Sequence, residues 1–285
     1  MKNVEIIMRA RNDMPLVSET LARLPEQSIP YRLIAFDNGS TDGTREALAA
    51  ASDVIRDVPA GKYVPGRILN EAARLCEGEI VVYLNSDCTP QNDRWLEELI
   101  APFKDPKVAA VFGRQIPRPN CEPLFAMDTE NTYGDGSMQK TWRHCFSMAS
   151  SAIRRSVWEA MPFSETLGYS EDIDWSWRVR EAGYTIAYAP KSIVAHSHNY
   201  SWTAFYKRQY GEGKAEAAIF EWTSWQRSII RYSILPYVRQ VLRDMKYCLS
   251  HGHLRSVFYS PVIRLAQMFG RRAGFQAGFN GGNHT

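Results

Sequence analysis

Residues 79–90 read EIVVYLNSDCTP, and this stretch decides the fold. Its first half, Ile80 to Leu84, is a short and nearly continuous apolar run, which is typical of a strand buried on both faces of a sheet. Its second half brings Asp87 to the carboxyl end of that strand, where open α/β sheets bind their ligands. A cap for the following helix explains Asp87 equally well, because Asp is a common turn residue.

Strand-like and helix-like segments alternate on both sides of this stretch. Apolar runs predict strands, and segments with helical periodicity lie between them. Such alternation indicates a parallel sheet with helices on both faces. We therefore expect an α/β fold, Rossmann-like, with a mostly parallel central sheet flanked by helices. The expected strands are 4–8, 32–36, 54–58, 80–84 and 108–112, and the expected helices are 15–24, 45–51, 66–75 and 95–103.

The alternation stops after Gly113. Residues 114–144 are rich in Pro, Asn, Asp and Gly, which predicts a long irregular segment, and such segments are usually functional or disordered. Helices are expected at 154–160 and from 171, and short strands at 186–188 and 193–195. We expect one α/β domain over residues 1–215 and a helical extension over residues 216–285.

Charge is distributed unevenly along the 285 residues. Residues 226–285 carry nine Lys or Arg and the single acid Asp244, and this net charge of +8 leaves −5 for the rest of a chain whose total is +3. A basic tail on an acidic body suggests a tail that meets something anionic. The hydrophobic content of 45% and the charged content of 23% are ordinary for a folded protein.

The cysteine content and the hydropathy of the chain indicate the cellular compartment in which the protein is expected. The five cysteines are odd in number and form no CxxC pair, which argues against a disulfide framework and a structural zinc site. The chain begins with a strand-like segment rather than a signal-peptide core, and no apolar run approaches the roughly 18 residues that a membrane span needs. These features predict a cytoplasmic protein.

The stretch DNGSTDGT, residues 37–44, follows the second expected strand and opens a helix. A nucleotide suits this position, because the Asp37 carboxylate would accept a hydrogen bond from N3–H of uracil or thymine. Neutral cytosine does not offer that donor. A β-turn followed by a helix cap explains the same residues without any ligand.

The stretch SEDIDW, residues 170–175, begins an expected helix. Capping by Ser170 and the positive end of the helix dipole explain much of its acidic composition. Partial burial against the neighbouring tryptophan rings would raise the pKa of a carboxylate here and would suit it to accept a proton.

His196-Ser197-His198 follows a short expected strand. Alternate residues of an extended segment face the same side, so the two imidazoles either converge on a ligand or lie on an ordinary sheet edge. A divalent ion held by Asp87 would need a further ligand, and a neutral imidazole suits Mn²⁺.

Together these segments resemble one family. Over residues 4–213 the chain is similar to inverting glycosyltransferases of family 2 with the GT-A fold, and among them to bacterial rhamnosyltransferase-like members that build cell-surface polysaccharides. The shared segments, in order, are VEIIMRARND, DNGSTDGT, GRILNEA with EGEIVVYLNSD, GRQIPRP, the ED-x-D-W helix and HSHNYS. The resemblance implies a nucleotide-sugar-dependent catalytic domain and an acceptor that is a cell-surface glycan or is lipid-linked.

The resemblance also implies roles for single residues. Asp37 would read the base, and Asp172 would be the general base. Asp87 would hold Mg²⁺ or Mn²⁺ as the retained second acid of the DxD motif, with His196 as the other protein ligand. The remaining candidates are Arg9, Arg11, Asn85 and Ser86 for nucleotide binding, and Glu171, His198 and Arg67 as additional site residues.

The first acid of the DxD motif is replaced by Asn85. Asn keeps an oxygen but loses a charge, so strict metal dependence stays open. Arg9 and Arg11 would supply part of the missing positive charge near the diphosphate. In the expected reaction Asp172 takes the proton of the acceptor hydroxyl, which displaces the diphosphate of a UDP- or dTDP-sugar with inversion.

The tail interleaves apolar and basic residues. This pattern suits a helix lying in a membrane interface, where anionic lipids attract each basic residue. A helix that packs on the catalytic domain, or on a second subunit in a homodimer, fits the pattern equally well. The apolar members are Trp222, Trp225, Ile229, Ile230, Tyr232, Leu235, Tyr237, Val238 and Leu242, and the basic members are Arg227, Arg231, Arg239, Arg243 and Lys246.

Two other classes fit parts of the sequence. A sugar nucleotidyltransferase shares the topology but carries a Gly-rich basic loop where this chain reads ARNDMP. A catalytically silent nucleotide- or glycan-binding protein would explain Asn85, although the three expected functional side chains Asp87, Asp172 and His196 are all present. No nucleic-acid-binding motif accompanies the basic tail. We therefore expect a cytoplasmic glycosyltransferase, peripheral on the inner face of the cell membrane if its tail binds lipid.

Overall fold

The structure is a computed structural model that describes residues 4–137 and 145–281. The chain divides into two compact units. The first comprises residues 1–118, 129–166 and 171–197, and the second comprises residues 119–128, 167–170 and 198–285. The boundary expected at residue 215 falls inside helix α8 (Trp202–Ile219), which lies within the second unit.

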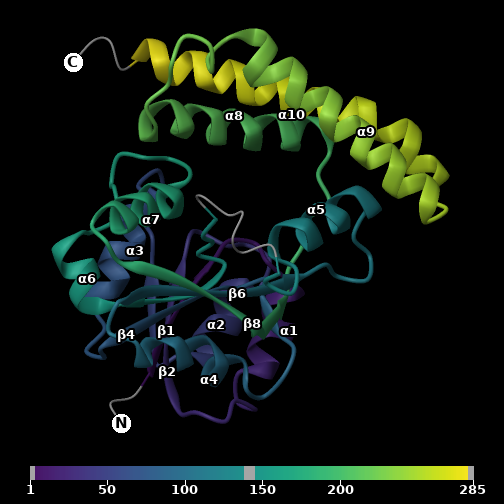
Figure 1. The fold of residues 1–285 in the computed structure, drawn as a ribbon. Helices are drawn as coiled ribbons and strands as arrows, with labels where there is room; N and C mark the ends of the chain where they lie inside the picture. The colour runs from purple at the N-terminus through teal and green to yellow at the C-terminus, as the bar shows by residue number, and fades with distance from the viewer. Residues whose placement is uncertain (1–3, 138–144, 282–285) are drawn as a thin grey trace. The chain divides into compact units, whose positions relative to one another are not determined.

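An eight-stranded sheet forms the centre of the first unit in the described part of the chain (Figure 1). Its strand order is β3-β2-β1-β4-β7-β6-β8-β5. The strands are β1 (Val4–Ala10), β2 (Tyr31–Asp37), β3 (Val54–Asp57), β4 (Ile80–Asn85), β5 (Thr89–Pro90), β6 (Val108–Ile116), β7 (Ser150–Arg154) and β8 (Thr185–Ala195).

The sheet is mostly parallel, as the sequence predicts. Strands β1, β2, β3 and β4 pair in parallel, as do β6 and β8. Strand β7, which the sequence did not predict at residues 150–154, is antiparallel to both β4 and β6. The two short strands expected at 186–188 and 193–195 are one strand, β8, because a register shift opposite Gly113 lets it continue past Pro190.

Helices cover both faces of the sheet, and each layer has its own apolar core. One layer packs residues of α1, α2 and α4 on the sheet, and the other packs residues of α3, α6 and α7. Trp95 and Trp175, both fully buried, belong to opposite layers. The helices are α1 (Leu16–Arg23), α2 (Thr44–Ala51), α3 (Pro65–Arg74), α4 (Trp95–Ile100), α6 (Arg155–Ala160) and α7 (Glu171–Glu181).

The segment 114–144, expected to be irregular, contains regular structure. Strand β6 continues to Ile116, and α5 occupies Pro123–Tyr133. Apolar residues of α5 that are buried, such as Leu124 and Met127, explain why a polar and proline-rich stretch folds there. Residues 138–144 of this prediction lie outside the described residues.

Helices dominate the second unit. A π-helical segment (Ile230–Ile234) leads into α9 (Leu235–Ser250), and α10 (Leu254–Gly281) follows. Gly270, Gly274 and Gly278 lie four residues apart on α10, and a Cβ on each would meet a backbone oxygen of α8 at 1.9–2.5 Å. These glycines therefore let α8 and α10 approach closely. Among the described residues, no helix is both long and apolar enough to span a membrane.

Candidate active site

The predicted site residues at the ends of β1, β2 and β4 lie at one edge of the sheet because the strand registers place them there. Ala10 of β1 pairs with Asp37 of β2, and Arg9 pairs with Asn85 of β4. Ser150, at the start of the antiparallel β7, pairs with Leu84 and so begins at the same edge. This is the carboxyl edge of the parallel strands, where α/β sheets bind ligands.

Asp37 is the last residue of β2 and is 1% exposed. Its Oδ2 accepts hydrogen bonds of 3.0 Å from the backbone N–H groups of Gly39 and Ser40. Gly39 permits this tight turn because its φ is +71°. Oδ1 is buried and accepts no hydrogen bond from any described residue. A buried acceptor without a donor is costly, so this oxygen is suited to receive a donor from a ligand.

Arg9 links three elements of the site. Its guanidinium donates to Asn85 Oδ1 and to the Tyr63 hydroxyl, both at 3.4 Å, and lies 3.5 Å from Glu171 Oε1. The Arg9 side chain is only 14% exposed, so these contacts hold a cation at the strand edge. Arg11, the other predicted arginine, is exposed.

Asp172 lies in the first turn of α7, beside Glu171. Its Oδ1 accepts from the Ile173 N–H at 2.8 Å, and Oδ2 accepts from the Met148 N–H at 3.4 Å. Burial, assisted by the Glu171 carboxylate, raises the pKa of Asp172 to about 7. A carboxylate with such a pKa is matched to accepting a proton near neutral pH.

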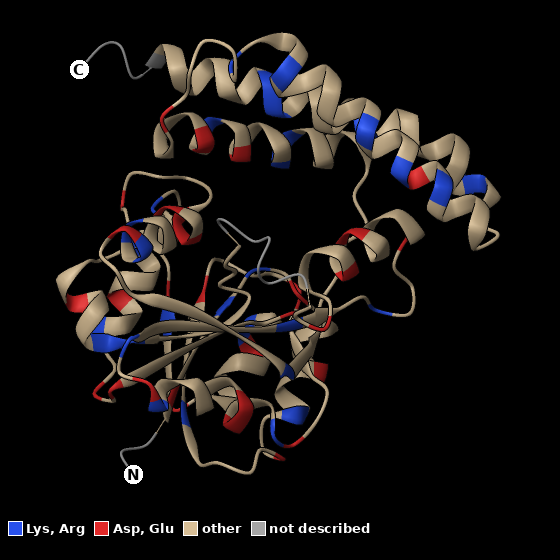
Figure 2. Cartoon of the chain, in the orientation of Figure 1, with Lys and Arg blue, Asp and Glu red and all other residues tan. Residues whose placement is uncertain are grey.

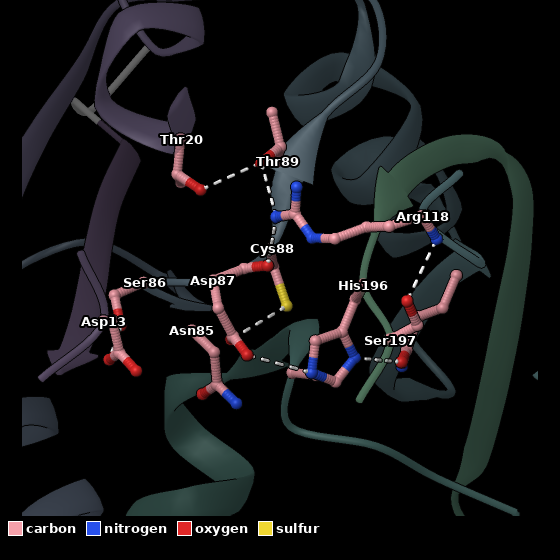
Figure 3. Close-up of polar contacts among 12 residues, drawn as sticks. Asp13, Thr20, Asn85, Ser86, Asp87, Cys88, Thr89, Arg118, His196 and Ser197 are labelled. Atoms are coloured by element: carbon pink, nitrogen blue, oxygen red, sulfur yellow. Dashed lines mark hydrogen bonds and ion pairs between the residues drawn. The ribbon is translucent and has the colours of Figure 1, made fainter. Parts of the chain in front are cut away.

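Asp87 and His196 face each other at this edge (Figure 3). The distance from Asp87 Oδ2 to His196 Nε2 is 3.5 Å, and the two side chains are 12% and 15% exposed. Such a spacing suits two ligand atoms of one ion, and a carboxylate with an imidazole is a donor set for Mn²⁺. His198 belongs to the second unit, as the first residue of its segment 198–285. The centroid of its ring lies 5.6 Å from that of Tyr200.

Gln115, whose role the sequence did not predict, holds the other side of the His196 ring. The distance from His196 Nδ1 to Gln115 Oε1 is 2.7 Å, and Gln115 Nε2 donates to the Ser147 hydroxyl at 3.0 Å. Gln115 is 3% exposed. With its oxygen towards Nδ1–H, Gln115 leaves Nε2 as an acceptor facing Asp87, which is the tautomer that binds a metal.

Arg118 fixes the backbone around Asp87. Its Nη2 donates to the carbonyl oxygen of Asp87 at 2.8 Å and to the Thr89 hydroxyl at 2.9 Å (Figure 3). Its backbone N–H donates to the Ser197 hydroxyl at 3.0 Å, next to His196. The motif GRQIPRP therefore supports both members of the Asp87–His196 pair. The sequence showed the motif GRQIPRP, but the residue types alone did not predict that its side chains contact His196 and the backbone of Asp87.

Ser86 is buried and donates towards Asp13 Oδ2 and the Arg9 carbonyl oxygen. Asp13, which the sequence did not single out, also accepts from the Arg11 backbone N–H at 2.9 Å. Burial raises the pKa of the Asp13 carboxyl. Ser86 therefore ties the loop after β1 to the end of β4.

Arg67 and Ser170 were also singled out by the sequence. Arg67, on α3, lies 3.7 Å from Glu165, and its side chain is 46% exposed. Ser170, expected as an N-cap, has φ = +58°, whereas an N-cap residue is usually extended.

Sequence comparison identifies the family. Residues 5–160 match the family described as glycosyl transferase family 2. The chain is 33% identical over 195 residues to the O-antigen chain rhamnosyltransferase WbaN of Salmonella anatum, an alignment that covers 65% of this chain and 62% of that relative. It is 28% identical over 226 residues to the O-antigen chain rhamnosyltransferase RfbN of Salmonella typhimurium, covering 74% and 71% of the two chains.

Structure comparison agrees on the fold. The mannosyltransferase PcManGT from Pyrobaculum calidifontis, solved in complex with GDP-Man and Mn²⁺, superposes with a TM-score of 0.65 at 19% identity and covers 98% of this chain and 87% of its own. At that identity the likeness concerns the fold, which is GT-A. With the family match over residues 5–160, the chain belongs to glycosyl transferase family 2, and its alignment spans 62% of the length of WbaN.

Proposed function

We propose that this enzyme transfers L-rhamnose from a dTDP- or UDP-linked donor to a hydroxyl group of a cell-surface glycan or lipid-linked acceptor, with inversion at the anomeric carbon. The choice of sugar is supported by the rhamnosyltransferases WbaN and RfbN, at 33% and 28% identity. Because sugar choice depends on loop detail, it needs the direct test below.

The observation that carries this proposal is the state of Asp172. A carboxyl group with a pKa of about 7, placed at the ligand-binding edge of the sheet, is matched to take the proton of an attacking hydroxyl. The backbone N–H groups of Ile173 and Met148 orient the two oxygens. General-base catalysis of this kind contributes about 10²–10⁴-fold.

Asp37 is proposed to bind the base of the donor. Its buried Oδ1 needs a donor, and N3–H of uracil or thymine supplies one. Both bases present the same group, so this contact selects against cytosine and does not choose between UDP and dTDP. Arg9 is proposed to face the diphosphate, where a guanidinium binds oxygen pairs well.

Asp87 and His196 are proposed to hold Mg²⁺ or Mn²⁺. Their facing Oδ2 and Nε2 atoms, 3.5 Å apart, fit a shared ion, and the Gln115 contact at Nδ1 orients Nε2 towards Asp87. His198, two residues along the chain, is proposed as a neighbouring ligand. A bound ion would neutralise charge on the leaving diphosphate, and Arg9 supplies a fixed positive charge at the same edge.

A donor panel tests the proposal. The enzyme is incubated with dTDP-rhamnose, UDP-rhamnose, UDP-glucose and GDP-mannose, each with Mn²⁺ or with EDTA, and nucleotide release and glycoside formation are followed. We expect turnover with a uridine or thymidine donor, rhamnose preferred, and a product whose anomeric configuration is inverted by NMR. Turnover with GDP-mannose alone, or a retained configuration, would refute the assignment.

Asp172→Asn separates catalysis from binding. We expect this variant to lose more than 99% of transfer, from the ~10²-fold lower limit of general-base catalysis, while dTDP binding by calorimetry stays near wild type. Transfer at more than a few per cent of wild type would remove Asp172 from the role of base.

A further inference from the structure

The second unit exposes an apolar surface on its C-terminal helices. Twelve of the eighteen exposed large apolar side chains among the described residues lie between residues 225 and 269, so exposure is concentrated there rather than scattered. Surfaces of this kind mark contacts with a protein or a membrane. The twelve are Trp225, Ile229, Ile230, Ile234, Leu235, Val238, Leu242, Leu249, Leu254, Phe258, Val262 and Phe269, and we call them the apolar face.

On α9 the exposed apolar residues share one side of the helix. Leu235, Val238, Leu242 and Leu249 are separated by three, four and seven residues, and Leu242 is 62% exposed. These separations return to the same side of an α-helix. The exposed Arg239 and Lys246 lie next to this stripe by the same helical geometry, whereas the buried Asp244 lies on the opposite side.

On α10 the apolar residues lie away from the packed side. The glycines at 270, 274 and 278 contact α8, whereas Leu254, Phe258, Val262 and Phe269 repeat at helical spacing on another side. Phe258 is 81% exposed. Helix α10 is therefore apolar on two sides, and only one of them is covered within the second unit.

The exposed charged side chains from residue 226 onwards are of one sign among the described residues. Asp244 is the only acid from residue 226 onwards, and it is fully buried with Arg264, whose Nε lies 2.7 Å from it. Arg231, Arg239, Lys246 and Arg255 are exposed. Figure 2 shows Lys and Arg recurring along the C-terminal helices. A second copy of this chain would oppose like charges if the same face met itself, whereas an anionic surface complements them.

We propose that the apolar face lies in the interface of an anionic lipid bilayer, with its apolar side chains below the headgroups and its arginines and lysines among them. Basic helices with exposed aliphatic and aromatic side chains bind membranes in this way, and each basic residue adds to the attraction. This inference deepens the proposed function, because it would bring the enzyme to a lipid-linked acceptor.

Vesicle binding tests this surface. Full-length protein is sedimented with vesicles of phosphatidylcholine and phosphatidylglycerol in equal parts, and with phosphatidylcholine alone. We expect at least about tenfold tighter binding to the anionic vesicles, weakened by salt. The variant Leu242→Glu with Phe258→Glu should lose at least about tenfold in binding, because two charges enter the apolar face.

A matched control and three outcomes make the test decisive. Tyr184→Glu changes an exposed aromatic residue in the first unit and should bind vesicles like wild type. Transfer to a water-soluble acceptor should be unchanged in all variants, which separates this inference from the proposed function. Equal binding to both vesicle types, or undiminished binding of the double variant, would overturn the proposal. So would a dimer in light scattering that the double variant abolishes, since a second copy would then cover the face.

A cavity in the second unit carries a separate inference. It has a volume of about 320 Å³ and is lined from three segments of the chain. Its polar lining contains no carboxylate among the described residues. The lining residues are Trp222, Gln226, Arg231, Tyr232, Ser233, Pro236, Tyr237, Gln240, Gln267, Met268 and Arg271.

The lining presents hydrogen-bond donors. Gln226 Oε1 already accepts from Thr223, and Gln267 Oε1 accepts from Arg264, so the two amide nitrogens are the ends left for a ligand. Ser233 is 5% exposed, and its hydroxyl has no hydrogen-bond partner among the described residues.

Glu216 holds two of the lining side chains in place. It accepts from the Tyr232 hydroxyl at 2.7 Å and from Arg271 Nε at 2.9 Å. Trp222 Nε1 donates to the Glu216 carbonyl oxygen at 3.0 Å. The cavity wall is therefore ordered before any ligand binds, which lowers the entropy cost of binding.

From these donors we infer that the cavity binds a phosphate ester. A phosphate offers only acceptors, which match two amide groups, a hydroxyl and the Arg231 guanidinium. The aromatic and Met side chains leave room for the apolar part of the ester. This inference is independent of the vesicle experiment and of the catalytic proposal.

The binding of inorganic phosphate, glycerol 3-phosphate and methyl glucoside is measured by calorimetry. We expect both phosphates to bind, glycerol 3-phosphate more tightly if a lipid headgroup is the natural occupant, and the neutral sugar not to bind. Gln267→Glu keeps the acceptor for Arg264 but adds a negative charge, so phosphate binding should fall at least about tenfold. Gln276→Glu, which adds the same charge on an exposed position of α10, should bind like wild type. No phosphate binding, equal binding of the sugar, or an unaffected Gln267→Glu would refute the inference.

Discussion

Asp172→Asn should stabilise the protein at alkaline pH while it abolishes transfer. The folded state raises the pKa of Asp172 to about 7, so folding favours its protonated form. From about pH 4 to about pH 7 the folded state therefore binds more protons than the unfolded state, and stability falls as pH rises. Above that range the ionised carboxylate is a constant cost, which a neutral asparagine removes.

The size of the effect follows from the pKa change. Three pKa units correspond to about 4 kcal/mol at most, and partial exposure of Asp172 reduces this to about 2 kcal/mol. Asparagine keeps the hydrogen bond from Ile173 but places an amide donor opposite the Met148 N–H, at a cost of about 1 kcal/mol. The net gain near pH 8 is then about 1 kcal/mol, and it vanishes near pH 5.

Thermal and urea unfolding of wild type and variant, from about pH 5 to about pH 8, measure this difference. A gain of 1 kcal/mol corresponds to about 2–4 °C in Tm for a chain of this size. Asp174→Asn is the matched control, because it removes a 2.9 Å ion pair with Arg178 on the same helix and should lose about 0.3–0.5 kcal/mol. A variant that is less stable than wild type at every pH, without a trend, would refute the raised pKa.

Four further results are expected. Wild-type kcat should fall about tenfold per pH unit below about pH 7, as Asp172 becomes protonated, and a flat profile down to about pH 5 would contradict this. Gln115→Leu should weaken Mn²⁺ binding about 10–100-fold by calorimetry, because the His196 ring loses its Nδ1 partner, and unchanged affinity would remove that role. Asp37→Asn should weaken dTDP binding at least about tenfold, because the amide oxygen would accept from the turn and the amide NH2, a donor, would meet the N3–H donor of the base. Unchanged dTDP binding would contradict a role of Asp37 in base recognition. Gly274→Ala should cost about 1–3 kcal/mol in urea unfolding, because its Cβ would meet the Tyr210 carbonyl oxygen at 1.9 Å, whereas Gly168→Ala, which meets nothing within 4 Å, should be neutral.

The sequence could predict residues that end strands. Asp37 and Asp87 follow apolar runs directly, and the rule that parallel strands share a carboxyl edge brings such residues together. The pairing of Ala10 with Asp37 and of Arg9 with Asn85 confirms that edge. The catalytic roles given to these residues remain predictions.

Residues that act through long-range contacts could not be predicted in this way. Gln115 lies 81 positions from His196, and Arg118 lies 31 positions from Asp87, so no local pattern connects them. The sequence predicted that the strand before Gln115 and Arg118 ends at residue 112. Strand β6 instead continues to Ile116, so Gln115 lies on it and Arg118 follows two residues later. Strand β7 was missed for a related reason, since its pairing with β4 and β6 depends on both neighbours rather than on its own sequence.

Asn85 and Arg9 are best understood together. Arg9 already lies 3.5 Å from Glu171, which offsets much of its charge, and its other guanidinium nitrogen contacts the neutral Asn85 oxygen. An aspartate at position 85 would place a second carboxylate on the same guanidinium and leave little positive charge for a diphosphate. Replacing that acid by an amide therefore lowers the charge available to a metal but preserves the charge of Arg9. On this reasoning we propose that Asn85 leaves Arg9 to neutralise part of the charge on the leaving diphosphate, so that the departure at position 85 is compatible with transfer.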